Sequence, residues 1–467
     1  MIENTTYDEM QVGTTATLKR TLTFEDIQLF AAMSGDVNPA HLDQEYAQAS
    51  PFKEIIAHGM WGGALISTVL GTRLPGPGTI YMGQSLKFMR PVHVGDELSV
   101  TVTVKALNPK NRVTLDCLCT NQKGETVIAG EAEVIAPAKK IRREEPELPE
   151  VVLEDHNRRY RQLIAAVSKL PPIRMAVAHP CSVDSLLGVV DAMRMGLIEP
   201  VVFAPRAKLA EVAEQAKCSL DGLTIVDVEH SHAAAAQAVR AVREGGAQAL
   251  MKGSLHTDEL LSEVVNKSTG LRTARRLSHV FVLDVPRYPK PLLVTDAAIN
   301  IAPTLEEKAD IIRNAIELAH AIGVELPKVA ILSAVETVTG KLQSTIDAAA
   351  LCKMADRGQI GGAILDGPLA FDNAVSMAAA KIKGISSPVA GDADILVVPD
   401  IEAGNILAKQ LEYLADAHAA GIVLGARVPI ILTSRADDER TRIASAAIAV
   451  LLATSPTWAA AQGHPAE

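Results

Sequence analysis

The chain has 467 residues, 48% of them hydrophobic, and a formal net charge of −10 at pH 7. This length predicts two or three domains, the acidic balance argues against a general nucleic-acid binder, and the apolar runs end well short of a membrane span. The five cysteines show no CxxC or metal-ligand spacing and the N-terminus is polar, which argues against a disulfide framework, a zinc site and a signal peptide and predicts a cytoplasmic protein.

The first predicted helix covers residues 23–35, TFEDIQLFAAMSG, where apolar residues recur at helical spacing. Thr23 is its expected N-cap, because Asp26 follows three residues later. A second helix is predicted at residues 59–71, GMWGGALISTVLG, which is apolar nearly all round and is therefore expected to be buried on most sides.

Between these helices, the stretch SGDVNPAHLD holds Asp36 and His41 five residues apart. Pro39 favours a turn at Asn38, and a turn can place the two side chains together. A carboxylate beside an imidazole can move protons near neutral pH. The alternative is that Asp36 and Asn38 only shape the turn and His41 caps the next helix.

Gly59 starts the second helix, where free N–H groups could bind a carbonyl oxygen as it gains negative charge. Three strands are then predicted at residues 97–107, 112–121 and 126–136, because apolar residues occupy alternate positions. The first domain is therefore expected to be an antiparallel sheet wrapped around one buried helix.

The segments SGDVNPAHLDQEYA, FKEIIAHGM and FMRPVHVGDEL resemble the MaoC-like, R-specific enoyl-CoA hydratases over roughly residues 10–136. The resemblance implies an α+β hot dog fold and a homo-oligomer. It also implies that Asp36 and His41 activate water for addition to a trans-2-enoyl-CoA, while the Gly59 N–H polarises the thioester carbonyl. Asn38 and His58 are candidate substrate-binding residues, although His58 could instead only orient the turn. Trp61-Gly62-Gly63 departs from the family, which often has Ser or a small residue shortly after HGM.

A linker is expected at residues 137–157, because APAKKIRREEPELPE contains three prolines and two opposite charge clusters. We therefore predict domains at residues 1–136 and 158–467. In the second domain, eight short apolar runs, from RMAVAHP to VPIILTS, alternate with Ala-rich helical stretches. This pattern predicts an α/β region with buried parallel strands. We expect one lobe at about 158–295 and 421–467, and a second at about 296–420.

Several polar residues of this region fall near predicted strand ends, where open α/β sheets bind ligands. Each also has an ordinary structural role, such as capping a helix, stabilising a turn or ending a strand. TGKLQST resembles a P-loop but lacks its first glycine, and no G-x-G-x-x-G supports nicotinamide binding. The candidates are Lys252, Thr257, Asp366, Asn405, Ser434 and Arg435.

The segments ALMKGSLHT, NKSTGLRTARRLSHV, DGPLAFDNAVS, PDIEAGNILAKQL and LTSRADDE resemble the phosphate acetyl/butyryl transferases, especially the butyryl branch, over residues 158–467. The resemblance implies two α/β lobes of the isocitrate dehydrogenase-like type with the site in their cleft. It implies that phosphate attacks an acyl-CoA, with no metal, no permanently bound cofactor and no covalent enzyme intermediate. Arg435 would hold phosphate or the thioester oxygen. Ser434 would hydrogen-bond the leaving sulfur or the phosphate, and Asn405 would help to position the acyl or phosphate oxygens.

One position departs from the transferase pattern. The acetyltransferases carry a proposed acidic base six residues after the arginine, and Thr441 occupies that position here. Asp437, Asp438 or Glu439 could substitute, so the base stays open.

The sequence thus predicts a bifunctional enzyme that uses coenzyme A thioesters and phosphate as substrates. A different class of function is also open, in which the C-terminal region is a non-catalytic acyl-CoA sensor or an oligomerisation module. The third alternative is an oxidoreductase, against which the missing dinucleotide motif counts.

Overall fold

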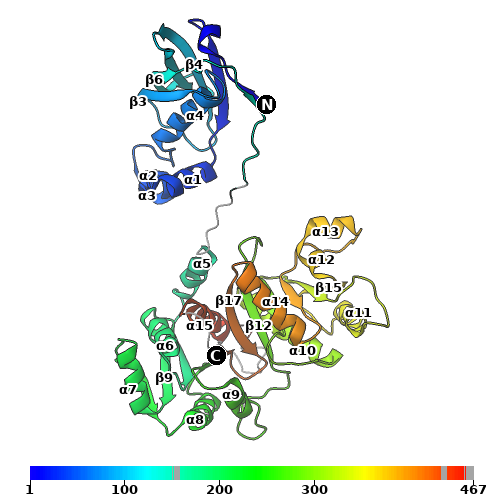
Figure 1. Ribbon diagram of the computed structural model, residues 1–467. Coiled ribbons are helices and arrows are strands. Elements are labelled where there is room, and N and C mark those ends of the chain that lie inside the picture. The colour runs from blue at the N-terminus through cyan, green and yellow to red at the C-terminus, as the bar shows by residue number, and fades with distance from the viewer. Residues whose placement is uncertain (150, 152–157, 433–438, 457, 459–467) are drawn as a thin grey trace. The chain divides into compact units, whose positions relative to one another are not determined.

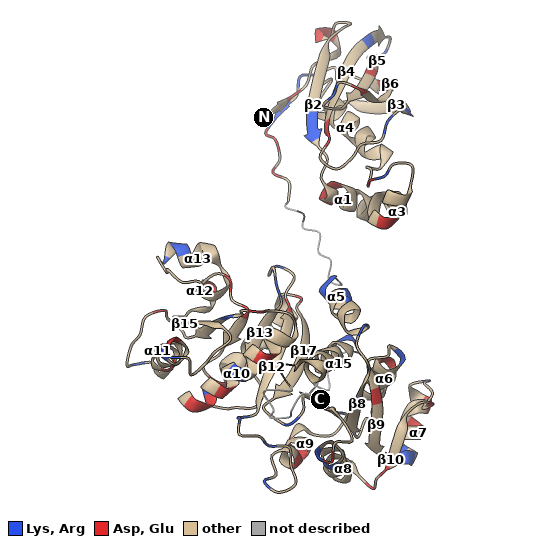
Figure 2. Cartoon of the chain, turned by 180° about the vertical axis from the view of Figure 1, so that it is seen from behind, with Lys and Arg blue, Asp and Glu red and all other residues tan. Residues whose placement is uncertain are grey.

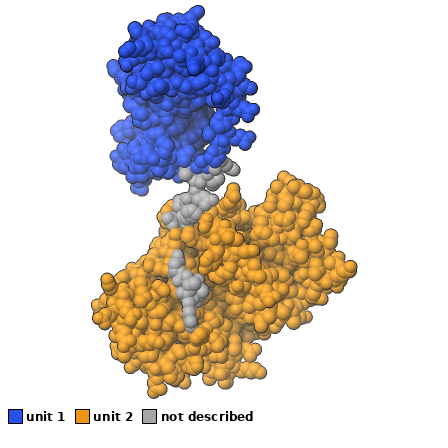
Figure 3. Space-filling view, viewed as in Figure 1, with its two compact units in different colours: residues 1–154 blue, residues 155–467 orange. Residues whose placement is uncertain are grey.

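The computed structural model describes residues 1–149, 151, 158–432, 439–456 and 458 (Figure 1). The chain divides into two compact units, residues 1–154 and 155–467, which Figure 3 shows in blue and orange. We describe each unit by itself.

Unit 1 contains a five-stranded antiparallel sheet in the order β2-β4-β5-β6-β3. The three predicted strands are confirmed, because alternating valine, leucine and cysteine side chains point into the core. The strands are β2 (Thr15–Thr21), β3 (Ile80–Phe88), β4 (Glu97–Asn108), β5 (Arg112–Thr120) and β6 (Thr126–Ile135). A turn at residues 122–124 joins β5 to β6.

The helix α4 (Gly59–Thr72) packs on this sheet, as expected of a hot dog domain (Figure 1). The prediction that it is buried on most sides is wrong for the single chain. Ile66 and Val69 are fully buried, but Met60 on another face is 55% exposed. The sheet of one chain covers only one side of the helix, so its other apolar side chains face outward.

Shorter elements complete unit 1: η1 (Tyr7–Glu9), α1 (Phe24–Ser34), α2 (Pro39–Leu42) and α3 (Gln44–Ala49). Thr23 caps α1 by accepting the Asp26 N–H, so the predicted capping box is confirmed. β1 (Ile2–Glu3) pairs with β7 (Arg142–Arg143), so the start of the expected linker 137–157 lies against unit 1.

Unit 2 is built on one eleven-stranded sheet in the order β10-β9-β8-β11-β18-β17-β12-β13-β16-β14-β15. All eight apolar runs predicted as parallel strands form parallel pairs. The strands are β8 (Ile173–Ala178), β9 (Ile198–Ala204), β10 (Thr224–Asp227), β11 (Ala249–Lys252), β12 (Ser278–Asp284), β13 (Leu292–Thr295), β14 (Lys328–Leu332), β15 (Ile364–Leu369), β16 (Ile395–Val397), β17 (His418–Leu424) and β18 (Ile430–Ile431). The sequence pattern missed three strands, β12, β13 and β17, and β12 pairs antiparallel with both of the others in the middle of the sheet.

Helices cover both faces of this sheet (Figure 1), as expected for buried parallel strands. They are α5 (Arg158–Val167), α6 (Val183–Arg194), α7 (Arg206–Gln215), α8 (Ser231–Arg243), α9 (Thr257–Val264), α10 (Leu305–Ala321), α11 (Gln343–Asp356), α12 (Phe371–Val375), α13 (Met377–Ile382), α14 (Ile401–Leu414) and α15 (Glu439–Thr454). The predicted lobe limits near residues 295 and 421 stay predictions, since a single continuous sheet crosses them.

Charged side chains of both signs lie on the outer helices, with acidic residues on α10 and basic residues on α5 and α13 (Figure 2). In the described part of the chain, no helix is both long and apolar enough to cross a membrane. All five cysteines are free thiols.

Candidate active sites

The turn between α1 and α2 places the first group of predicted residues. Gly35 ends α1 in the left-handed conformation, with φ at 77°. The chain then turns, and Pro39 begins α2 as its first residue. The Asn38 side chain caps α2 by accepting the Ala40 N–H at 3.1 Å, and the Asn38 N–H donates to Asp36 Oδ1 at 3.2 Å. Asn38 therefore shapes the turn.

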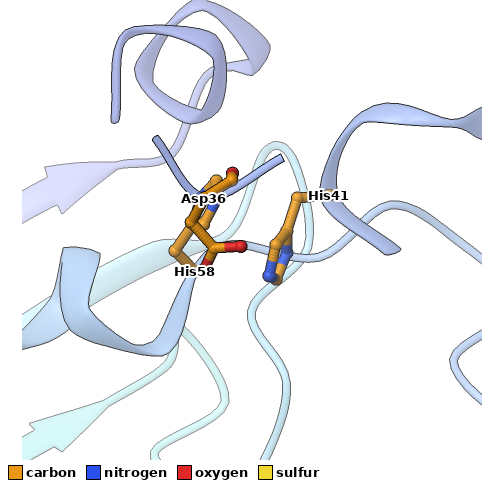
Figure 4. A group of neighbouring side chains, drawn as sticks. All are labelled: Asp36, His41 and His58. Atoms are coloured by element: carbon orange, nitrogen blue, oxygen red, sulfur yellow. The ribbon is translucent and has the colours of Figure 1, made fainter. Parts of the chain in front are cut away.

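This turn brings together Asp36, His41 and His58 (Figure 4). One ligand atom of each side chain lies within 4.8 Å of the other two, and Asp36 is exposed while both histidines are buried. His41 lies on α2 and does not cap it, so the predicted pairing of carboxylate and imidazole is present in space.

A hydrogen bond to the main chain fixes the tautomer of the neutral His41 ring. Its Nδ1 lies 2.8 Å from the carbonyl oxygen of Ile56. A carbonyl can only accept, so we assign the proton to Nδ1. The neutral ring then keeps a lone pair on Nε2, which is the arrangement that a general base requires.

His58 contacts both Asp36 and His41. Its Nε2 lies 2.9 Å from the backbone carbonyl oxygen of Asp36, and its ring centroid lies 3.9 Å from that of His41. The Phe30 ring packs on His58 at 4.9 Å. His58 therefore holds both the Asp36 turn and the His41 ring.

Two glycines of α4 are explained by close packing. A Cβ at Gly59 would lie 3.0 Å from the Phe88 ring, so the small residue keeps space open beside the free N–H groups of the helix. A Cβ at Gly62 would lie 2.4 Å from Ile128, so glycine lets α4 approach β6. This packing gives a structural reason for the Trp61-Gly62-Gly63 departure.

In unit 2, Lys252 ends β11 and is buried. Its Nζ lies 3.3 Å from the carbonyl oxygens of Gly253 and Leu255. Thr257 is the first residue of α9, five positions further along the chain. These two candidates therefore lie at the carboxyl end of β11, as predicted.

Asn405 lies on α14, in contact with a loop that the sequence reasoning missed. Its Nδ2 donates to the Ala297 carbonyl at 3.3 Å. In this loop, the buried Asp296 accepts three backbone N–H groups, those of residues 298, 299 and 300, and the Asn300 side chain. Burial raises the pKa of Asp296, and the hydrogen bonds oppose the shift. The only sequence signal was the polar TDAAIN stretch after an apolar strand.

Asp366 lies far from Lys252 in the sheet. It lies on β15 at one end of the sheet, and its Oδ1 accepts the Gly367 N–H at 2.9 Å. Seven strand steps separate β15 from β11, or roughly 34 Å at about 4.8 Å per step. The geometry therefore does not support Asp366 in a site shared with Lys252. Ser434 and Arg435, the central predicted residues, lie outside the described residues.

Comparison with known proteins matches this two-part architecture. The family model for a MaoC-like domain matches residues 8–122, and the model for phosphate acetyl/butyryl transferases matches residues 221–450. A phosphate acetyltransferase from Rhizobium meliloti is 62% identical over 63% of this chain and 93% of its own length.

Two solved structures are also similar to parts of the chain. A branched-chain phosphotransacylase from Enterococcus faecalis is 33% identical, with a TM-score of 0.54, and the match covers 60% of this chain and 99% of that one. An R-hydratase from Pseudomonas aeruginosa is 50% identical over 32% of this chain and 98% of its own, with a TM-score of 0.32. The chain belongs to the phosphate acetyl/butyryl transferase family and carries a MaoC-like domain ahead of its transferase region.

Proposed function

We propose that unit 1 hydrates short trans-2-enoyl-CoA thioesters to (R)-3-hydroxyacyl-CoA. The observation that carries this proposal is the His41 ring, whose Nδ1–H is held by the Ile56 carbonyl so that Nε2 is available beside Asp36. A water held between Nε2 and the carboxylate would attack the β carbon of the substrate. The same pair would return a proton to the α carbon, so that water adds across the double bond.

The Gly59 N–H would bind the thioester oxygen, which gains negative charge as the β carbon is attacked. It is well suited because no side chain caps the start of α4 and no side chain at position 59 covers this N–H, whereas the Trp61 N–H donates to the His58 carbonyl. Asn38 is then a residue that shapes the turn, and His58 one that positions the catalytic pair, rather than groups that bind substrate.

For unit 2 we propose reversible transfer of an acyl group from CoA to phosphate. The sequence identity to the Rhizobium meliloti phosphate acetyltransferase supports this reaction. Lys252, Thr257 and Asn405 would contribute to substrate binding, and Ser434 and Arg435 keep the roles that the resemblance implies. Acyl-CoA and phosphate enter as substrates, and neither reaction needs a bound cofactor or metal.

We also propose that the protein is a homo-oligomer in which unit 1 pairs with a second copy through β3. This strand ends the sheet and, among the described residues, pairs with β6 alone. Ile80, Met82 and Phe88 on it are 55%, 52% and 53% exposed. An exposed apolar edge strand is a template for another strand, so a second copy would cover it.

The test is a paired assay on the purified chain. Hydration is followed as loss of crotonyl-CoA absorbance, and transfer as CoA release from acetyl-, propionyl- and butyryl-CoA with and without phosphate. Both activities are expected. CoA release that does not depend on phosphate would contradict the transferase proposal, and stable crotonyl-CoA would contradict the hydratase proposal.

A further inference from the structure

His179 adopts a backbone conformation that its neighbours disfavour. It follows β8 directly, precedes Pro180, and has φ at 54°. The left-handed region is uncommon for residues with a Cβ, and a following proline normally imposes extended backbone. Strained conformations of this kind persist only where the surrounding structure holds them, and they cluster at functional sites.

Several hydrogen bonds hold His179 in this conformation. Its carbonyl oxygen accepts the Ser254 N–H at 2.9 Å, the Ser254 hydroxyl at 2.9 Å and the Cys181 N–H at 2.8 Å. Its own N–H donates to the Phe203 carbonyl at 2.8 Å. The residue is therefore fixed by β9, by the segment that follows β11 and by the segment that precedes α6.

The same serine fixes the imidazole tautomer. Ser254 Oγ also lies 3.2 Å from His179 Nδ1. The Ser254 hydroxyl donates its one proton to the His179 carbonyl and accepts the Cys181 N–H at 3.1 Å, so we assign the ring proton of His179 to Nδ1, which donates to the same oxygen. Nε2 is left with its lone pair, and it makes no hydrogen bond within the described part of the chain.

His179 stands at the carboxyl ends of three adjacent parallel strands, β8, β11 and β18. Ala178 pairs with Lys252, and Met251 pairs with Ile431. Strand neighbours are about 4.8 Å apart, so the ends of β8 and β18 are separated by roughly 10 Å. The chain order changes direction between β8 and β11, which is where open α/β sheets bind their ligands.

On the basis of the transferase function proposed above, we propose that His179 is the catalytic acid–base residue of unit 2. Nε2 accepts the proton of hydrogen phosphate as a phosphate oxygen forms a bond to the thioester carbon. The tetrahedral intermediate then expels the sulfur, and the C–S bond breaks. The imidazolium returns the proton to the thiolate, giving acyl phosphate and free CoA with no net proton change.

The charges around His179 suit this role. Burial lowers the pKa of its imidazole, the Lys208 cation on α7 lowers it further, and Glu259 on α9 opposes both effects. The ring is therefore neutral at pH 7 and able to accept a proton. The neighbouring Cys181 is no competing nucleophile, since burial raises the pKa of its thiol to about 11.

The test replaces His179 by Gly in the full chain, because glycine adopts positive φ without strain. We expect kcat for phosphate-dependent CoA release to fall about 10²–10⁴-fold, with KM for acyl-CoA little changed and part of kcat restored by added imidazole. Ser254→Ala should lower kcat about tenfold, because the ring loses the oxygen that keeps its proton on Nδ1. His320→Gln, on α10, is the matched control and should transfer at the wild-type rate.

The pH profile gives a second readout, measured with the phosphate dianion held constant. Wild-type kcat should fall as His179 is protonated, at a pH below the ordinary imidazole range because its pKa is lowered, and His179→Gly should lack this fall. His179→Asn, which tolerates the left-handed region, replaces the glycine variant if circular dichroism shows that it has unfolded. If the wild type transfers acyl groups and a His179 variant keeps a kcat within threefold of the wild-type value, the inference is overturned. If the wild type itself is inactive in transfer, the proposed function is overturned instead.

Discussion

At the scale of single residues, both proposed reactions depend on histidines whose tautomer is set by a neighbouring oxygen. A main-chain carbonyl fixes His41, and a serine hydroxyl fixes His179. The sequence predicted the first pair because Asp36 and His41 lie in one turn. It did not predict the second, because Ser254 is 75 residues away from His179 and only the sheet brings them together.

His58 offers a direct test of positioning. In His58→Phe the ring stack on His41 can persist, but the Asp36 carbonyl loses its donor. An unmet hydrogen bond of this kind costs about 1–3 kcal/mol, so we expect kcat for hydration to fall about 10-fold or more with KM little changed. His58→Gln, which keeps an N–H donor, should restore much of the rate; equal losses in both variants would argue against the role.

At the scale of elements, local patterns predicted most of the secondary structure. The Thr23 cap, the alternating strands of unit 1 and the apolar runs of unit 2 each depend on residues close in sequence. The long-range features were missed. The exposed face of α4 depends on which elements cover it, and β12, β13 and β17 gain their places in the sheet by pairing with strands distant in sequence.

The junction of β8 and β11 tolerates no side chain at Gly253. A Cβ there would lie 2.4 Å from the His179 carbonyl oxygen and 2.6 Å from that of Ala178. We expect Gly253→Ala to destabilise unit 2 by about 1–3 kcal/mol in chemical denaturation and to reduce acyl transfer. Gly340→Ala, where nothing lies within 4 Å of the new Cβ, is the control; equal stability of the two variants would contradict the packing argument.

The middle of the large sheet should be sensitive to acid through His279 on β12. Burial lowers the pKa of this imidazole to about 4. In the unfolded chain it titrates near 6.5, so the unfolded state gains a proton first as the pH falls. The free energy of unfolding of unit 2 should therefore fall by up to about 3 kcal/mol between pH 6.5 and pH 4.

Denaturant unfolding at pH 7 and pH 5 measures this effect. His279→Gln should reduce the pH dependence, and His320→Gln should leave it unchanged. An unaltered slope in the His279 variant would assign the acid sensitivity to other groups.

At the scale of the whole molecule, two families that both act on acyl-CoA thioesters are joined in one chain. The oligomer proposed through β3 is tested by Met82→Lys, which places a charge on the exposed edge strand. We expect sedimentation to show a smaller assembly for this variant. Leu118→Lys, on the exposed face of the central strand β5, should leave the assembly intact, and an unchanged Met82 variant would place the interface elsewhere.

The central claim is that one chain contains two independent catalytic sites. The most direct measurement assays hydration and phosphate-dependent CoA release in wild type, Asp36→Asn and Arg435→Ala. We predict that Asp36→Asn loses about 10²-fold or more of the hydration rate and keeps transfer, while Arg435→Ala does the reverse. Acyl-CoA binding without phosphate-dependent release in the wild type would contradict the claim and make unit 2 a sensor or a scaffold for the hydratase.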